Sequence, residues 1–416
     1  MAITNLKVSN FKSFKDLDLN LGPFNVVIGA NAAGKSNFVE IFKFLRTVQQ
    51  EDLVDAISLH GGPDSILNRN VGSSKPLRMR TVSDQKMTWP GQVGCFAYET
   101  TYEFSLQAGS LPNGLRVGDE RFVQRLRTTA EDEQIEFEIA ILMSEGKRKV
   151  EISPPDISER IKDRRSHLGP SSSLTLHAYI EQLREVFSGA ATNALLPHLG
   201  LFGMVRPFGN LFGRVGVYDI DPRAVKRPHD TAGRAALDEH GENLALVLKK
   251  ILADPEKSRK FHNLVRYLLP FVAEVGTEKY LGESVLLRLR EEYYEGDLLA
   301  NLLSDGTVDV VALIIALFFE DKDVVIIEEP ERNIHPHLIS GLVTLMKDAA
   351  RNKQVIITTH SPEVVRHAGV ENLLLLSRDK EGFSTVSKPA EKEAVKVFLK
   401  NELGLDELFV QDVLSI

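Results

Sequence analysis

A run of small residues, GANAAGKSN, contains the first pattern in this chain that predicts chemistry. It begins at Gly29 and fits the spacing G-x-x-x-x-G-K-[ST], in which two glycines let the backbone curl so that its N–H groups face phosphate oxygens. The amino group of Lys35 is expected to reach the β- and γ-phosphates of a nucleotide, and the hydroxyl of Ser36 is expected to hold Mg²⁺. The alternative is a glycine turn that matches by chance. The other residues expected around the phosphates are Asn31, Ala32, Ala33, Gly34 and Asn37.

Two acidic residues and a histidine form a second group. Glu328 and Glu329 follow the run DVVII, and His360 ends QVIITTH further along the chain. Glu328 stands where an acidic residue holds the water shell of Mg²⁺, and Glu329 is a candidate general base for an attacking water. His360 is a candidate sensor of the γ-phosphate. Alone, the acidic pair is more typical of a solvated turn closed by Pro330, and the histidine of a satisfied core group. Beside a phosphate loop, the functional interpretation is favoured.

These residues need a scaffold that brings them together, and the surrounding pattern predicts one. The segments FNVVI, DVVII and QVIIT are short continuous apolar runs, which are typical of strands buried in a parallel sheet. FVEIFKFLRTV, directly after the glycine run, has the apolar spacing of a helix. Ligands bind at the carboxyl ends of parallel strands, so the three groups of residues are expected at one edge of a sheet.

A polar turn, LLSDGT at residues 302–307, precedes an apolar segment with helical character. Ser-Asp-Gly turns commonly cap helices, so one interpretation is a helix cap and nothing more. The other interpretation is that the positive end of this helix has an anion to bind.

The segments GANAAGKSN, LLSDGT, VVIIEEPE and TTHSP occur in the order and spacing of an ABC-type ATPase head. With the opening ITNLKVSNFKSFKDLDLNLGPFNVVIGANAAGKSN, the chain resembles the branch that contains RecF, the SMC proteins and the overcoming-lysogenization-defect (OLD) ATPases. It is most similar to compact bacterial AAA-family ATPases of the RecF-like, phage-defence type. The resemblance implies an α/β fold: a RecA-like parallel sheet core with a phosphate-binding loop, an antiparallel β-lobe, a helical signature lobe and a short insert without a long coiled coil.

The same resemblance implies the cofactors ATP and Mg²⁺. LLSDGT corresponds to the signature turn, whose Ser304 and Gly306 are then expected to contact the γ-phosphate of ATP held by a second subunit. Lys12 and Ser13 are expected near the nucleotide, although a surface turn between two strands explains them equally well. The glutamine loop of the family has three candidates: Gln85, Gln92 and Gln107.

Three positions depart from the family pattern. Asp305 replaces the usual second glycine of the signature turn, Glu328 replaces the usual aspartate on the magnesium side, and Ala32 replaces a glycine of the phosphate loop. None of these changes removes a needed functional group, so slow turnover is expected rather than none.

The resemblance also divides the chain. Residues 1–152 are expected to form an N-terminal ATPase lobe with the phosphate loop and a β-subdomain, 153–214 a helical and loop insert, and 215–416 a C-terminal lobe with the signature helix, acidic pair and histidine. SMC-like proteins carry a long coiled coil at the insert, but this segment has no sustained heptads and is interrupted by Pro and Gly. The segment after the last expected strand is too short for the TOPRIM nuclease domain of OLD proteins, so any cutting is expected from a separate effector.

Composition restricts the partners. The formal net charge of −8 argues against a protein that coats nucleic acid through bulk charge. The single cysteine, Cys95, excludes an internal disulfide framework and fits the cytoplasm, and no segment reads as a signal peptide or membrane span. Two basic clusters leave DNA contact open, although a solvated face is the usual explanation of such runs: Lys147, Arg148 and Lys149, and Arg160, Lys162, Arg164 and Arg165.

Three functions remain. The favoured one is an ATP-hydrolysing dimerisation switch in DNA repair or anti-phage defence. It would act as a homodimer or higher homo-oligomer through composite ATP sites and control a separately encoded effector. The first alternative is an ATP-binding assembly scaffold with negligible turnover, against which Glu329 argues. The second is a transporter-type nucleotide-binding subunit, which is disfavoured by the NFKSFKD opening and by the long β-rich region after the phosphate loop.

Overall fold

The computed structural model describes residues 2–84, 87–88, 95–109, 114–130, 133–144, 146–157, 183–185, 189–190, 195, 211–230, 232–233, 236–280, 282–392, 395 and 405–410. Internal contacts divide the chain into two compact units, each assembled from separate stretches. The first unit contains Met1–Leu21, Glu40–Gly213 and Arg378–Thr385. The second contains Gly22–Val39, Arg214–Ser377 and Val386–Ile416. The glycine loop thus groups with the C-terminal half of the chain, and the predicted division at residues 152 and 214 stays a prediction.

A nine-stranded sheet forms the first unit, with the order β10-β9-β8-β7-β6-β4-β1-β2 and with β5 paired to β6. Neighbouring strands are antiparallel, as predicted for the β-lobe. The strands are β1 (Ile3–Phe11), β2 (Phe14–Asn20), β4 (Leu77–Ser83), β5 (Met87–Thr88), β6 (Cys95–Ala108), β7 (Leu115–Ala130), β8 (Glu133–Ser144), β9 (Lys147–Ser153) and β10 (Gly189–Ala190). Short helices accompany them: α2 (Leu53–Leu59), α3 (Pro63–Ile66) and the 3₁₀ helix η1 (Gly72–Ser74).

The second unit is built on a six-stranded sheet with the order β11-β16-β17-β3-β18-β19. Its first five strands are parallel, and β3 and β17 are buried along their whole length. The continuous apolar runs of the sequence therefore form a buried parallel core, as predicted. The strands are β3 (Phe24–Ile28), β11 (Val215–Tyr218), β16 (Val324–Glu328), β17 (Gln354–Thr358), β18 (Leu373–Arg378) and β19 (Ser384–Ser387).

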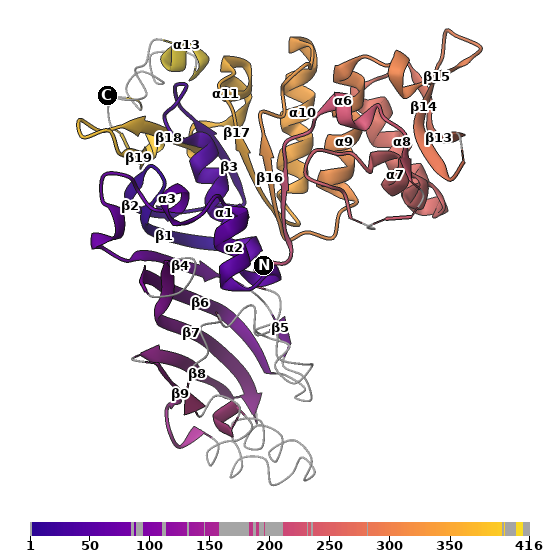
Figure 1. The fold of residues 1–416 in the computed structure, drawn as a ribbon. Coiled ribbons are helices and arrows are strands. Elements are labelled where there is room, and N and C mark those ends of the chain that lie inside the picture. The colour runs from indigo at the N-terminus through magenta and orange to yellow at the C-terminus, as the bar shows by residue number, and fades with distance from the viewer. Residues whose placement is uncertain are drawn as a thin grey trace. The chain divides into compact units, whose positions relative to one another are not determined.

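Helices cover this sheet, with α10 packed on β17 and α11 on β3 (Figure 1). Within the second unit, α9 is buried from Thr307 to Leu317 and packs against α6, α8 and α10, which explains its nearly uniform apolar sequence. The helices are α6 (Pro222–Val225), α7 (Leu244–Leu252), α8 (Pro255–Leu268), α9 (Asp305–Phe318), α10 (Pro336–Ala349), α11 (Pro362–Ala368) and α13 (Leu405–Val410), with 3₁₀ helices η2 (Ala300–Leu302), η3 (Val370–Asn372) and η4 (Pro389–Glu391).

A four-stranded antiparallel sheet precedes α9 and packs on α7 and α8 (Figure 1). It contains β12 (His229–Asp230), β13 (Val272–Tyr280), β14 (Ser284–Glu291) and β15 (Asp297–Leu299). The sequence predicted helices around the signature turn but not this sheet.

The helix that follows the glycine loop, α1 (Lys35–Gln50), is the longest of the described helices at 16 residues. The described part of the chain therefore has no coiled-coil arm, whereas most of the predicted insert, at residues 153–214, lies outside the described residues. None of its helices is long and apolar enough to cross a membrane.

Candidate functional site

The glycine loop joins the end of β3 to the start of α1, which is the strand–loop–helix arrangement predicted from the sequence. Gly29, Ala32 and Gly34 have φ angles of 154°, 63° and 114°, so the loop curls through left-handed conformations. A Cβ atom at Gly29 would lie 2.4 Å from the carbonyl oxygen of Leu376 in β18, so no other residue fits there. The loop is therefore tightly packed against the sheet on one side, while Asn31 and Ala32 are exposed on the other.

Lys35 lies across its own loop. Its Nζ atom donates to the carbonyl oxygens of Gly29 at 2.8 Å and of Ala30 at 3.3 Å. Burial lowers the pKa of the Lys35 ammonium, against the opposing charges of Glu329 and Glu331. A half-buried cation therefore stands at the N-terminus of α1, beside the exposed Ser36.

The strand ends bring the predicted residues to one edge of the six-stranded sheet. β17 lies between β16 and β3, and its register aligns Thr358 with Glu328 on one side and with Val27 on the other. His360 follows β17, and Gly29 follows β3. The glycine loop, the acidic pair and the histidine thus gather at the carboxyl edge, as the parallel arrangement predicted.

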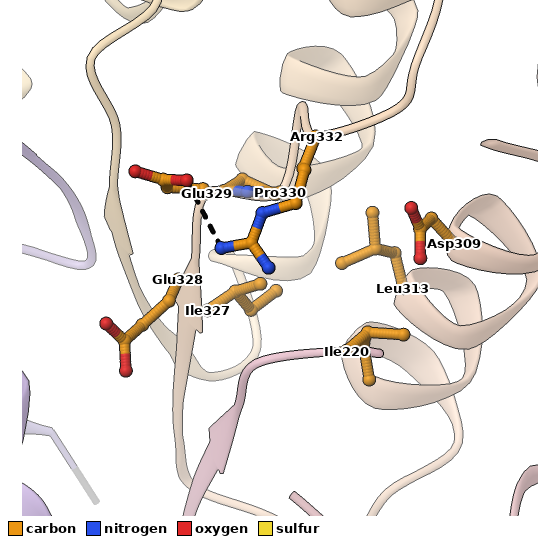
Figure 2. A pocket seen from close by; sticks show the side chains of 8 residues that line it. All are labelled: Ile220, Asp309, Leu313, Ile327, Glu328, Glu329, Pro330 and Arg332. Atoms are coloured by element: carbon orange, nitrogen blue, oxygen red, sulfur yellow. Dashed lines mark hydrogen bonds and ion pairs between the residues drawn. The ribbon is translucent and has the colours of Figure 1, made fainter. Parts of the chain in front are cut away.

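Glu329 is held from several sides. Its φ angle is +45°, which is unusual for a residue with a side chain, and its N–H donates to the carbonyl oxygen of Thr358 at 2.9 Å. Nδ1 of His360 donates to Oε1 at 2.9 Å. On the other side, Nη2 of Arg332 donates to Oε2 at 3.2 Å, as Figure 2 shows. Burial opposes ionisation, but the Arg332 hydrogen bond and the charges of His360 and Arg332 outweigh it, so the pKa of Glu329 lies below its usual value.

Arg332 joins two acidic residues. Besides its contact with Glu329, its Nη1 atom donates to Oδ1 of Asp219 at 3.1 Å. No pattern in the sequence points to this arginine, because in the run EEPERN it is typical of a charged residue in a solvated turn.

Glu331 was missed for the same reason. Its Oε1 atom accepts from the Thr359 hydroxyl at 2.5 Å, and its Oε2 atom is buried without a hydrogen-bond partner. Burial raises the pKa of Glu331 above its usual value, although the Thr359 hydrogen bond opposes the shift. The repeated acid in EEPE was the available signal in the sequence.

The LLSDGT turn caps its own helix. Ser304 is the N-cap of α9, and its Oγ atom accepts from the backbone N–H of Thr307 at 3.1 Å. The side chain of Leu302, just before the turn, is 65% exposed. The cap interpretation is thus correct for the single chain, and a contact with a second subunit stays a prediction.

The same turn also contacts the chain after the acidic pair. A Cβ atom at Gly306 would lie 2.4 Å from the carbonyl oxygen of Asn333, so the two backbones touch. Asp305 pairs with Lys226 at 2.5 Å, which gives a structural role to the residue that departs from the family pattern.

One turn further into α9, Asp309 is 5% exposed. Its Oδ2 atom accepts from Nδ2 of Asn333 at 3.0 Å, whereas Oδ1 is buried without a hydrogen-bond partner. Burial raises the pKa of Asp309 to about 7, against the Asn333 hydrogen bond. No sequence signal pointed to this residue, because it lies in an otherwise apolar helix.

A small pocket lies between α9 and the end of β16 (Figure 2). Its volume of about 10 Å³ is close to what one water molecule needs. The residues that line it are Ile220, Asp309, Leu313, Ile327, Glu328, Glu329, Pro330 and Arg332.

Two predicted nucleotide contacts lie in the first unit. Nζ of Lys12 is 3.3 Å from Oε2 of Glu40, and buried Ser13 accepts a hydrogen bond from Ser384 at 2.8 Å. Their contact with a nucleotide stays a prediction. Of the candidates for the glutamine loop, Gln107 lies in β6, whereas Gln85 and Gln92 fall outside the described residues.

The first basic cluster lies in β9, where Arg148 is turned inward. Its side chain is 8% exposed and lies 3.5 Å from Oε2 of Glu120, and Lys149 pairs with Glu151 at 2.8 Å. Arg148 is therefore not available to a DNA backbone. The second cluster, at residues 160–165, lies outside the described residues.

Known structures with a similar fold include heads of SMC proteins. A crystal structure described as the SMC head bound to the C-terminal winged-helix domain of ScpA has a TM-score of 0.50 and 14% identity, covering 93% of this chain and 97% of that chain. A crystal structure described as the SMC head domain with an extended coiled coil, bound to the C-terminal domain of ScpA and derived from Pyrococcus furiosus, has a TM-score of 0.46 and 13% identity, with 96% of this chain and 99% of that chain covered. The SMC head domain of Thermotoga maritima has a TM-score of 0.39 and 13% identity, with 93% and 99% covered.

No curated protein matches the sequence. A family match does exist, and it runs over residues 24–366, from β3 into α11. This range includes the glycine loop, the LLSDGT turn, the acidic pair and His360. The chain therefore belongs to the family described as "AAA domain, putative AbiEii toxin, Type IV TA system", and its fold is that of an ABC/SMC-like ATPase head.

Proposed function

We propose that the protein binds ATP with Mg²⁺ and hydrolyses it, and that two copies share their ATP sites. The observation that carries the proposal is the common edge of β3, β17 and β16, where Lys35, His360 and Glu329 meet. A chance glycine turn does not explain why an ammonium group, a histidine and a carboxylate converge beside it.

The residues in and around the glycine loop fit a nucleoside triphosphate. The loop needs its glycines, and the N-terminus of α1 and the Lys35 ammonium supply positive charge beside it. The loop residues from Gly29 to Asn37 would surround the phosphates, and Ser36 and Glu328 would hold Mg²⁺. The metal, when bound, would neutralise charge that develops on the phosphates.

The remaining residues would prepare the attacking water. Glu329 would accept the proton of a water that attacks the γ-phosphorus, as the ADP oxygen leaves. His360, which already bonds to Oε1 of Glu329 at 2.9 Å, would orient this carboxylate and contact the γ-phosphate. Ser304 and Gly306, at the N-terminus of α9, would complete the site of a second copy.

The proposal extends to the biological role of the ATPase. We assign the chain to a nucleotide-driven dimerisation switch in DNA repair or anti-phage defence that controls a separately encoded effector. The family description, which names a putative toxin of a type IV TA system, supports a setting with a second component. Both Glu329 oxygens already accept hydrogen bonds, which favours slow turnover in a single chain.

Two substitutions test the ATPase. Lys35→Ala should abolish ATP binding in calorimetry, because backbone N–H groups alone do not neutralise a triphosphate. Glu329→Gln should bind Mg²⁺-ATP as the parent does but hydrolyse it roughly a hundred- to ten-thousand-fold more slowly, because the base is lost while the shape stays. Glu256→Gln, an exposed glutamate in the first turn of α8, is the control. Tight ATP binding by Lys35→Ala would refute the loop assignment, and parental turnover by Glu329→Gln would refute the base.

A further inference from the structure

Arg332 restrains the carboxylate to which we assign the chemistry. Its guanidinium bridges Oε2 of Glu329 and Oδ1 of Asp219 at 3.2 Å and 3.1 Å. His360 takes the other oxygen of Glu329. A general base needs a lone pair directed at the water, and the Arg332 hydrogen bond occupies one of the two lone pairs on Oε2, so this bond restrains Glu329.

A second acceptor for Arg332 lines the same pocket. Asp309 is buried, and its Oδ1 atom has no hydrogen-bond partner. A buried carboxylate oxygen without a donor is unfavourable, and a guanidinium is the donor that suits it best. The charge of Arg332 already acts on Asp309 across the pocket. Figure 2 shows both side chains among the residues that line it.

The turn at residues 304–306 contacts the backbone next to Arg332. Asn333, the next residue, donates to Asp309 and touches Gly306 through its backbone. The φ angle of Asn333 is +61°, so this part of the chain is already in a left-handed bend. A displacement of the turn at residues 304–306 therefore acts on the backbone that carries Arg332.

We propose that Arg332 is a positioning residue with two acceptors: in the separate chain it restrains Glu329, and when the α9 turn engages a second copy it transfers to Asp309. The transfer frees Oε2 of Glu329 for water and gives the buried oxygen of Asp309 its missing donor. Hydrolysis is thereby withheld until two chains meet. This inference rests on the proposed role of Glu329 as general base.

The test compares ATPase rates per chain below and above the protein concentration at which copies associate, as followed by sedimentation. Arg332→Ala is expected to raise the rate of the dilute protein about two- to five-fold, which is the range that a partly exposed ion pair contributes. Arg332→Gln, which keeps more of the side-chain volume, should do the same if the alanine variant folds poorly. Asp309→Asn keeps an oxygen that can accept from Asn333 but loses the charge. It should lower the ratio of the ATPase rate of the assembled protein to that of the dilute protein.

Arg214→Ala is the matched control. Like Arg332, Arg214 bridges two acidic residues of the same unit, here Asp321 and Asp323, and it is comparably exposed. The ATPase rate of the dilute Arg214→Ala variant should equal that of the dilute parent. The double variant Arg332→Ala with Asp309→Asn should behave like Arg332→Ala alone, because Asp309 acts only through Arg332.

The outcomes separate the two proposals. An unchanged or lower dilute rate in both Arg332 variants overturns the restraint, and a further loss on adding Asp309→Asn overturns the second acceptor. A parent rate per chain that is independent of concentration overturns the coupling to assembly. Glu329→Gln combined with Arg332→Ala must remain as slow as Glu329→Gln alone. Parental turnover in Glu329→Gln would remove the base assignment itself, whereas a slow Glu329→Gln with an unaltered Arg332→Ala removes only the restraint.

Discussion

Asp309 is a carboxyl group in an apolar helix, with a pKa raised to about 7 chiefly by burial. The groups that face it are Asn333, which donates to it, and the charges of Asp305, Arg332 and Asp221. Because the folded pKa lies above the unfolded value of 3.8, the folded chain binds more protons here than the unfolded chain. The stability that this group contributes is fully present below the unfolded pKa and is lost as pH rises through about 7.

Between about pH 5 and about pH 8, the free energy of unfolding of the parent should fall by about 2 to 3 kcal/mol more than that of Asp309→Asn, which has no proton to lose. Urea denaturation of both proteins at each pH measures the difference, and all other titrating groups cancel in the comparison. A parallel pH dependence of the two proteins would show that Asp309 is ionised normally in the folded state.

At the scale of elements, the start of α9 and the bend after β16 fit together only because residue 306 is glycine. Gly306→Ala adds a Cβ atom 2.4 Å from the carbonyl oxygen of Asn333, and backbone cannot move away as a flexible side chain does. We expect a loss of about 1 to 3 kcal/mol in the free energy of unfolding, although alanine is the better helix former. Gly22→Ala is the control, since a Cβ atom there has no neighbour closer than 3.7 Å. Equal denaturation midpoints for the two variants would contradict the contact.

The elements that could be predicted from the sequence are those whose apolar pattern is typical of a single kind of structure. FNVVI, DVVII and QVIIT are mostly apolar because β3, β16 and β17 lie buried in the sheet, and the positions of the residues at their ends follow from the parallel order. β14 was missed because SVLLRLRE mixes buried and exposed positions without clean alternation. Arg332, Asp309 and Glu331 could not be predicted, since their importance depends on burial and on contacts between segments distant in sequence.

At the scale of the whole molecule, the proposed sharing of ATP sites predicts complementation in trans. Ser304→Arg keeps a good phosphate loop, and Lys35→Ala keeps a good signature turn, so each alone should be inactive. A mixed dimer rebuilds one complete site. With equal and freely exchanging chains, activity should return to about a quarter of the parent value, or less if both sites must act together.

The measurement is the steady-state ATPase rate after mixing the two purified variants, once subunit exchange has been shown with labelled chains. No recovery despite proven exchange, with Ser304→Arg folded, would argue against a shared site. Full activity of Ser304→Arg alone would leave the turn with its capping role only.

The second unit is assembled from stretches that are far apart in the sequence, and this affects the order in which it can fold during translation. β3 leaves the ribosome early, but its partners in the sheet, β17 and β18, come from the other end of the chain, with Val355 beside Phe24. The nascent chain can build the hairpins of β6 to β9 from neighbouring residues, whereas the strand that carries the phosphate loop must wait unpaired for almost the whole of translation. A chain interrupted before β17 therefore carries the glycine loop without the strands against which this loop packs.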